Sequence, residues 1–424
     1  MHASAASRLA GARPVAAICW VLSLSMIGVL CWHAVPRLMV DLQVYRAGAR
    51  AVLHHRGLYD MYAIHRLQFT YPPAAAIAAI PVALLPLGLA KLAWIPLVYV
   101  PLGVAVRYGF RPLLARFGHH AGAAFALILG ACALLLPLRQ EIEFGQIDML
   151  LAAACLVDCA SPRVGWPRGL LVGLATAIKL EPGVFIVYLL ITGRRRAAGT
   201  AALAFAGATA LGFALAPADS VAYWTHAIFD PRRLGGNASA ANQSVRAMVL
   251  RAYLPVHGPA AVWLALAAVV ALAGFAAAWA CWHRGSDLAG LAITGLLEAA
   301  LSPVAWIHHL CWVAVALGVI AGDGSSRRRI VTATLAFALF VSSLPIAAQA
   351  ALNADHWPEL PGRLAEDSFG LAAVALIAVL YLAGDSGPPN APGELPGGPG
   401  LPEQREPGTG QADRTGIGLG GLVQ

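Results

Sequence analysis

Asp41 is the first residue of the chain whose type and place suit chemistry. It follows the first long apolar segment, at the head of DLQVYRAGARAVLHH, and residues 42–55 predict a short amphipathic helix lying on a membrane surface. A carboxylate at this lipid–water boundary is well placed as a general base that takes a proton from an acceptor hydroxyl. The alternative is an N-cap aspartate that only stabilises the helix start, which position alone favours.

Two adjacent histidines, His308 and His309, stand just past a proline near the end of another apolar segment, in LSPVAWIHHLCW. An imidazole there could hold a phosphate or orient a hydroxyl. Adjacent helical residues point about 100° apart, so we expect at most one ring to face a given cavity. The pair lacks the i,i+4 spacing of helical metal ligands, so no metal-ligating residues are predicted. The alternative role is anchoring at the membrane interface beside Trp306 and Trp312.

The connection RQEIEFGQIDML carries a third group of polar residues between two apolar segments. Gly145 permits a tight turn there. Gln146 offers both hydrogen-bond donors and acceptors to a substrate, and Asp148 adds a carboxylate. Glu141 and Glu143 are expected to be ordinary polar loop residues.

Lys179 lies in the middle of the apolar stretch GLLVGLATAIKLEPGVFIVYLLI, which falls within 169–192. A lysine in bare lipid costs at least about 2.5–3.5 kcal/mol, and Pro182 breaks a helix locally. These two facts predict a hairpin of two half-helices whose tip, residues 179–182, lies in a protein-lined or watery cavity. The cation there suits a lipid-phosphate leaving group. The alternative is a structural ion pair with Glu181 or Glu298.

The last polar group lies in a long loop, in ANQSVRAMVLR, where Asn242 and Gln243 precede the next apolar segment. No P-loop, GxSxG, HExxH or dinucleotide fingerprint is present in the sequence. The chain also lacks a soluble domain that could bind a nucleotide-linked substrate. A group donor would therefore come from the membrane.

The composition explains why so few polar residues need to be considered. The chain has 424 residues, 59% of them hydrophobic and 12% charged, about half the usual charged share. Its mean hydropathy is +0.69. These values exclude a soluble enzyme, a disordered chain and a fibrous protein. The net charge of +8 does not indicate nucleic-acid binding, because the arginines form short clusters between apolar blocks.

The apolar blocks predict an all-α polytopic membrane protein. The expected spans are about 16–35, 88–107, 121–138, 146–160, 169–192, 197–217, 260–282, 287–302, 306–322, 330–350 and 368–384. The first is too long for a secretory signal and is expected to be an uncleaved first helix. Residues 74–87, broken by two prolines, are expected to form an interfacial or re-entrant helix.

The arginines set the topology. With a cytoplasmic N-terminus and a hairpin at 169–192, the basic clusters all become cytoplasmic, as the positive-inside rule requires. These clusters are Arg107/Arg111/Arg116, Arg163/Arg168, Arg194–Arg196, Arg284 and Arg327–Arg329. Residues 1–15 are then a cytoplasmic N-terminus and 16–384 a transmembrane domain with outer loops at about 36–73 and 218–259. Residues 385–424, rich in proline and glycine, are expected to be a disordered cytoplasmic tail.

Six patches of the sequence carry a family resemblance. They are VDLQVYRAGA (40–49), FTYPPAAA (69–76), FGQIDMLL (144–151), GLLVGLATAIKLEPGVFIVYLL (169–190), NQSVRAMVLR (242–251) and LSPVAWIHH (301–309). In this order they resemble glycosyltransferase family 87 of the GT-C superfamily, the polyprenol-phosphate-mannose-dependent alpha-(1,2)-mannosyltransferases of actinobacteria. The resemblance extends from about residue 15 to 384 and includes the enzymes that extend phosphatidylinositol mannosides.

The resemblance implies a GT-C fold with about 10–12 membrane helices and re-entrant or interfacial helices. It implies inverting transfer of mannose from a polyprenyl-phosphate donor to a glycolipid or lipoglycan acceptor at the outer face of the plasma membrane. Asp41 maps onto the catalytic base. The expected donor- and acceptor-binding residues are Arg46, Tyr71, Gln146, Asp148, Lys179, Asn242, Gln243, His308 and His309. No cofactor beyond the lipid donor is expected, and a metal requirement stays open.

One residue departs from the family pattern, and two other functions stay open. Asp148 stands where asparagine is expected after GQI, which bears on donor or acceptor preference. One alternative is an arabinofuranosyltransferase using decaprenyl-phosphate arabinose. The other is a lipid-linked sugar transporter with Lys179, Glu181 and Glu298 along its path, but it would require matched inverted halves that the sequence lacks.

Overall fold

The computed structural model describes residues 2–252 and 260–384, and within them all regular structure is helical. The predicted tail 385–424 and the end of the predicted loop 218–259 fall outside the described residues. The helices of the first half are α1 (His2–Ala34), α2 (Val40–Leu53), α3 (Pro73–Ala78), α4 (Ile80–Leu84), α5 (Leu87–Gly109), α6 (Arg111–Arg116), α7 (Ala121–Ala133), α8 (Leu136–Phe144), α9 (Asp148–Ala160), α10 (Leu170–Ile178) and α11 (Val184–Ile191). Those of the second half are α12 (Arg195–Leu215), α13 (Pro217–Thr225), α14 (Val245–Ala252), α15 (Ala260–His283), α16 (Asp287–Leu301), α17 (Val313–Ala321), α18 (Arg327–Val341), α19 (Leu344–Asn353), α20 (Glu359–Glu366) and α21 (Ser368–Ala383). Short 3₁₀ turns include η3 (Glu181–Gly183) and η6 (Ile307–Trp312).

Four of the described helices are long and apolar enough to cross a membrane: α1 over Pro14–Ala34, α5, α12 and α15. Three bent pairs, α7 with α8, α18 with α19, and α20 with α21, raise this number to seven if each pair is one span. Several predicted spans are instead helices of 13 to 16 residues, such as α9, α16 and α21. At about 1.5 Å per residue these cover roughly 20–24 Å, less than the 30 Å hydrocarbon core. The single helix expected over residues 74–87 is instead two short helices, α3 and α4, which end at Leu84.

The segment 169–192 folds as the predicted hairpin. α10 and α11 are joined by η3. The start of α10 and the end of α11 both lie at the C-terminal end of α9. Near the start of α10, the Val172 amide donates to Asp158 Oδ2 at 3.1 Å. Just past the end of α11, Arg194 Nη1 donates to Cys159 O at 3.5 Å. The two half-helices therefore begin and end on one side of the molecule.

The tip of the hairpin contacts the other end of α9. There Lys179 Nζ donates to Asp148 Oδ1 at 2.5 Å. Asp148 lies ten residues before Asp158, which is about 15 Å along a helix. The hairpin thus carries Lys179 through about half the thickness of a hydrocarbon core and places it among protein groups rather than lipid.

Two glycines allow this hairpin to pack closely. A Cβ atom at Gly169 would lie 1.9 Å from the Ala197 carbonyl oxygen, and one at Gly173 would lie 2.2 Å from the Ala201 carbonyl oxygen. The two glycines are one helical turn apart, so α10 and α12 make backbone contact along one face, as small residues permit in membrane helices.

α16 forms the centre of the bundle. Nearly all its residues are buried, whereas α15 beside it has few buried residues, as a lipid-facing helix would. The Trp312 ring packs directly on Gly295, where a Cβ atom would lie 2.1 Å away, and its Nε1 donates to Glu298 Oε2 at 3.1 Å. This contact fixes η6, and with it both histidines, against the core.

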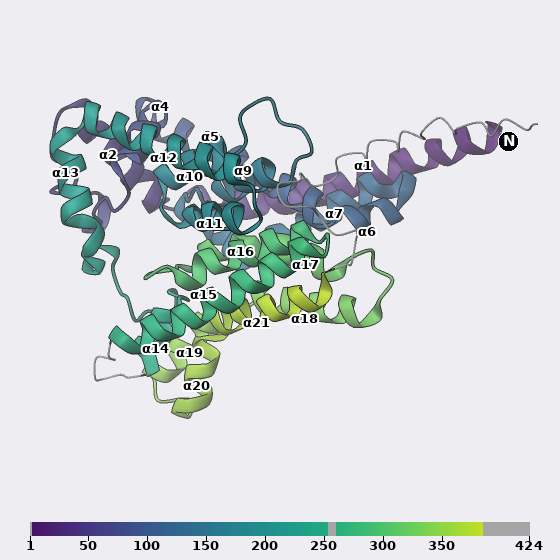
Figure 1. Cartoon of the computed structure of the whole chain (residues 1–424). Helices are drawn as coiled ribbons and strands as arrows, with labels where there is room; N and C mark the ends of the chain where they lie inside the picture. The colour runs from purple at the N-terminus through teal and green to yellow at the C-terminus, as the bar shows by residue number, and fades with distance from the viewer. Residues whose placement is uncertain (1, 253–259, 385–424) are drawn as a thin grey trace, which may run out of the picture.

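The bundle has two distinct ends. In Figure 1, α2, α4 and α13 gather at one end, whereas α6 and the start of α1 lie at the other. α5, α9 and α16 connect the two ends. The candidate catalytic residues lie at the end that includes α2.

Candidate active site

Asp148, Lys179, His308 and His309 meet in one buried cluster, although they come from three distant parts of the chain. Lys179 Nζ lies 2.5 Å from Asp148 Oδ1 and 3.0 Å from His309 Nε2. His308 Nε2 lies 3.9 Å from the other carboxylate oxygen of Asp148. The Lys179 and Asp148 side chains are 3% and 5% exposed. The alternative prediction that Lys179 forms an ion pair with Glu181 or Glu298 is wrong, because its partner is Asp148.

Both histidines reach the same cluster, so the prediction that at most one would do so is wrong. The prediction assumed a regular α-helix, but η6 is a 3₁₀ turn with non-helical backbone at Leu310 (φ −81°, ψ 19°). The ring centroids are 4.8 Å apart. Both imidazoles are buried, which also excludes the anchoring role at a membrane interface.

Several polar atoms of the cluster have no hydrogen-bond partner among the described residues. They are both ring nitrogens of His308, Nδ1 of His309 and Oδ2 of Asp148, all buried. A buried polar group without a partner is costly, and such groups are concentrated where a ligand supplies the missing bond. The geometry therefore fits a site that receives phosphate and hydroxyl oxygens.

Asp41 lies beside this cluster, at the start of α2. The N-cap of α2 is Met39, in the left-handed region, and no side chain caps the helix, so the N-cap role considered for Asp41 is wrong. The Asp41 side chain instead forms a hydrogen bond with the Gln146 side chain. It also interacts electrostatically with Lys179 and Asp148. Asp41 is partly exposed, whereas Asp148, Lys179 and the two histidines beside it are buried.

The environment of Asp41 makes it a better base than an exposed aspartate. Burial raises the pKa of its carboxyl to about 6, against the opposing effects of the Gln146 hydrogen bond and the Lys179 charge. A general base works best when its pKa lies near the working pH. At neutral pH, Asp41 is ionised and still basic enough to accept a proton.

Two tyrosines join Asp41 to the Asp148 cluster through Gln146. The Tyr45 hydroxyl donates to Gln146 Oε1 at 2.7 Å and lies 3.2 Å from the Tyr71 hydroxyl. Gln146 Nε2 donates to the Tyr71 hydroxyl at 3.5 Å. Lys179 Nζ lies 5.7 Å from the centre of the Tyr71 ring. The predicted residues Tyr71 and Gln146 therefore belong to one continuous polar site.

The α8–α9 turn positions Gln146 and Asp148. Gly145 ends α8 with φ +74°, a left-handed conformation that glycine adopts without steric cost, which confirms the predicted turn. A Cβ atom at Gly145 would lie 2.6 Å from Leu42 Cβ, so the turn packs directly on the first turn of α2. Trp94 Nε1 donates to Gln146 O at 2.8 Å and holds the turn from the other side.

Three predicted binding residues have internal partners instead. Arg46 donates to the Val82 carbonyl oxygen and, at 2.7 Å, to that of Leu85, so its guanidinium holds the end of α4 rather than a phosphate. The apolar side of α2 is likewise buried against protein, which differs from the expected surface helix.

Asn242 and Gln243 are the other two. Asn242 Oδ1 accepts from the Ala305 amide at 2.9 Å, and its Nδ2 donates to Asn237 O at 2.9 Å. Gln243 Oε1 accepts from the Gly370 amide at 2.7 Å. Both side chains connect distant loops, and neither is available to a substrate.

Sequence reasoning missed three residues at the site. Tyr45 lies one helical turn after Asp41, a spacing that signals a shared helix face. Glu141 is fully buried rather than an ordinary loop residue, whereas Glu143 pairs with Arg37 near the surface. Trp94 carries no signal, because its role depends on the packing of α5 against the α8–α9 turn.

The cluster also has the ligand types of a metal site. One ligand atom from each of Asp148, His308 and His309 lies within 4.8 Å of the others. Lys179 Nζ, however, already contacts two of these three residues. A metal ion could bind these residues only by displacing the Lys179 ammonium. In this structure, Lys179 therefore supplies the positive charge that a metal ion would supply.

Comparison with known proteins decides the family. The model of glycosyltransferase family 87 matches residues 69–303. The chain belongs to this glycosyltransferase family. No solved structure matches the chain.

Curated relatives of this family-87 glycosyltransferase cover most of its length. It is 33% identical over 353 residues to a polyprenol-phosphate-mannose-dependent alpha-(1-2)-phosphatidylinositol mannoside mannosyltransferase of Mycobacterium tuberculosis, covering 78% of this chain and 82% of the relative. The protein of the same name from Mycolicibacterium smegmatis is 34% identical over 401 residues, covering 86% and 89%. A pentamannoside mannosyltransferase of M. tuberculosis strain Oshkosh is 34% identical over 299 residues, covering 68% of each chain. None of these three is named as an arabinosyltransferase or a transporter.

Proposed function

We propose that this family-87 enzyme transfers a mannosyl residue from polyprenyl-phosphate mannose to a phosphatidylinositol mannoside or a related glycolipid. The main observation that supports this proposal is that the partly exposed Asp41 lies beside the buried Lys179–Asp148 ion pair. Such a pairing supplies a base for the acceptor and a cation for a phosphate leaving group. The names of the relatives support this donor and this acceptor class.

The reaction is a single displacement. Asp41 takes the proton of an acceptor hydroxyl, and that oxygen forms a bond to C1 of the β-linked donor sugar as the bond from C1 to the phosphate oxygen breaks. The polyprenyl phosphate leaves as an anion and needs no general acid. Lys179, with His308 and His309 beside it, stabilises the charge that develops on the phosphate. Displacement inverts C1 and gives an α-linkage.

The site lies at the outer face of the plasma membrane in this proposal. The arginine clusters of α6, the α9–α10 connection, the start of α12 and the start of α18 lie at the end of the bundle away from Asp41, as the positive-inside rule requires of a cytoplasmic end. A lipid-anchored donor can then place its sugar at Asp41 while its chain stays in the bilayer.

Donor choice can be measured directly. Membranes containing the protein are incubated with polyprenyl-phosphate [14C]mannose or, separately, with decaprenyl-phosphate [14C]arabinose, and glycolipids are separated by thin-layer chromatography. We expect labelled glycolipid from the mannose donor alone. Label from arabinose alone would replace the proposed substrate, and label from neither donor would contradict transferase activity toward these lipids.

Transfer should depend on pH through Asp41. Only the ionised carboxylate accepts a proton, and its pKa is about 6. We therefore expect kcat/KM to fall about tenfold per pH unit below pH 6 and to level off above pH 7. The measurement is kcat/KM between pH 4.5 and 8. An acid limb that ends near pH 4 would contradict the raised pKa.

We propose that transfer needs no metal ion, because the Lys179 ammonium takes the place of one. Purified enzyme should keep its activity, within about twofold, after dialysis against EDTA. The control is the same enzyme with Mg²⁺ or Mn²⁺ restored. Loss of activity in EDTA and its recovery with a divalent cation would contradict this proposal.

A further inference from the structure

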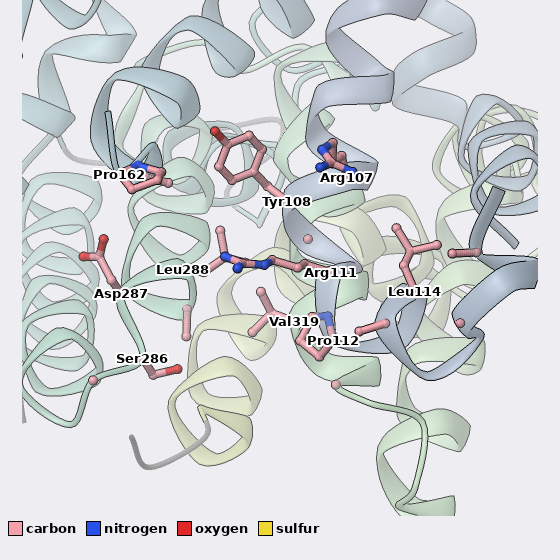
Figure 2. Close-up of a pocket in the computed structure, with 18 residues that line it drawn as sticks. Arg107, Tyr108, Arg111, Pro112, Leu114, Pro162, Ser286, Asp287, Leu288 and Val319 are labelled. Carbon is pink, nitrogen blue, oxygen red and sulfur yellow. The ribbon is translucent and has the colours of Figure 1, made fainter. Parts of the chain in front are cut away.

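A second site with a different chemistry lies at the opposite end of the bundle. A cavity of about 830 Å³ there has Arg107, Arg111 and Asp287 in its lining. Figure 2 shows these three side chains around it. This volume lies within the range of sites that bind small molecules or headgroups. No residue of the Asp41 site lines it.

The cavity is separated from the Asp41 site by the length of the helices that connect them. α9 begins at Asp148 in the site and ends at Ala160 in the cavity lining, twelve residues or about 18 Å further on. α5 contributes Trp94 near the site and Arg107 at the cavity, about 20 Å apart by the same rise. The cavity is therefore spatially separate from the Asp41 site.

Two arginines give the cavity its charge. Arg107 and Arg111 are exposed, and neither has a hydrogen-bond or ion-pair partner among the residues that the structure describes. In Figure 2 the Arg111 side chain extends into the cavity. Guanidinium groups bind phosphate through paired hydrogen bonds, so two unpaired guanidinium groups at one cavity favour a phosphate ligand.

The carboxylate in the lining does not neutralise these arginines. Asp287 Oδ1 accepts from Arg194 Nη2 at 2.7 Å and from the Tyr188 hydroxyl at 2.5 Å. Its charge is therefore balanced from within the bundle. The cavity keeps the positive charge of Arg107 and Arg111.

Much of the remaining lining is apolar. Leu114 and Ala115 line the cavity from α6, and Leu288 and Val319 line it from α16 and α17. A soluble anion would gain nothing from such a wall. A phospholipid would place its phosphate on the arginines and its acyl chains along the apolar side.

We propose that this cavity binds the headgroup of an anionic phospholipid from the leaflet opposite the Asp41 site. The lipid would join α5 and α6 to the start of α16 and so stabilise the end of the bundle that carries no substrate. This proposal does not depend on the proposed function, since no donor or acceptor takes part in it.

The test is lipid binding by the purified full-length protein, measured by native mass spectrometry in a non-ionic detergent. The probes are phosphatidylglycerol, phosphatidylcholine of the same chain length, and sn-glycerol 3-phosphate. We expect phosphatidylglycerol to bind at least about tenfold more tightly than phosphatidylcholine. We expect millimolar glycerol 3-phosphate not to displace it. Equal binding of the two lipids, or displacement by the soluble phosphate, would overturn the proposal.

Three variants separate the cavity from general surface charge. The double substitution Arg107→Gln/Arg111→Gln should weaken phosphatidylglycerol binding at least about tenfold. The matched control, Arg195→Gln/Arg196→Gln, removes the same charge from exposed arginines that do not line the cavity, and should change binding less than about threefold. Equal losses in both variants would overturn the proposal.

The third variant, Ala115→Trp, reduces the space without changing the charge. It should also weaken phosphatidylglycerol binding at least about tenfold. All three variants alter exposed positions, and their folding is checked by gel filtration and thermal melting. Unchanged lipid binding in a folded Ala115→Trp protein would place the lipid elsewhere.

Discussion

Replacing Asp41 with asparagine should lower mannosyl transfer by about 10²–10⁴-fold, the usual contribution of a general base. Asparagine keeps the size and hydrogen bonding of the side chain but cannot accept a proton from the acceptor. Because Asp41 caps no helix and forms no ion pair in the described structure, the variant should insert and fold normally. Transfer is measured with purified protein and labelled donor, and folding by thermal melting.

The matched control is Asp60→Asn, which changes an exposed aspartate in the same predicted outer loop. It should retain transfer within about twofold. The two variants carry the same change in charge, so any difference between them comes from position. An Asp41→Asn protein that is folded and retains more than about a tenth of wild-type transfer would contradict the assignment of Asp41.

Replacing Lys179 with methionine should have two separate effects. Transfer should fall by about 10²–10³-fold, because the leaving phosphate loses the group that stabilises its charge. The protein should also lose about 3–5 kcal/mol of stability, because Asp148 remains buried without its cation. The measurements are labelled transfer and thermal melting in detergent.

A double variant separates these two effects. Adding Asp148→Asn to Lys179→Met removes the unpaired buried charge, so most of the lost stability should return. Transfer should remain low, because the cation is still absent. If transfer returned together with stability, Lys179 would serve only as a structural partner of Asp148, and its role toward the phosphate would be wrong.

The sequence was informative about the site wherever a polar residue interrupts an apolar segment. Lys179 is an example, because a lysine and a proline in a membrane-length segment leave few arrangements other than a hairpin. The structure confirms that hairpin and shows, beyond the prediction, that its tip contacts Asp148. Asp41, Gln146 and the two histidines likewise stand out, since little else in the chain is polar.

The same reasoning was less reliable for polar residues in loops. Asn242 and Gln243 look like substrate ligands in the sequence, but their amides connect the loop to Ala305 and Gly370, which lie far along the chain. Arg46 contacts the carbonyl groups at the end of α4. Local sequence does not reveal such partners, because they depend on tertiary packing.

The helix count differs from the sequence-based expectation for a similar reason. Hydropathy marks α16 as a span, but this helix of 15 residues is buried on nearly all sides by other helices. An apolar segment of this length can be the core of a membrane protein as readily as a span. Length and packing distinguish the two, and hydropathy alone does not.

The anomeric configuration of the product tests the central claim most directly. Purified protein is given β-linked polyprenyl-phosphate mannose labelled with ¹³C at C1 and a phosphatidylinositol mannoside acceptor, and the product is analysed by NMR. A single displacement with Asp41 as the base predicts a new α-mannoside, formed by the wild-type protein and not by Asp41→Asn. A β-mannoside, or release of free mannose without transfer, would contradict this account.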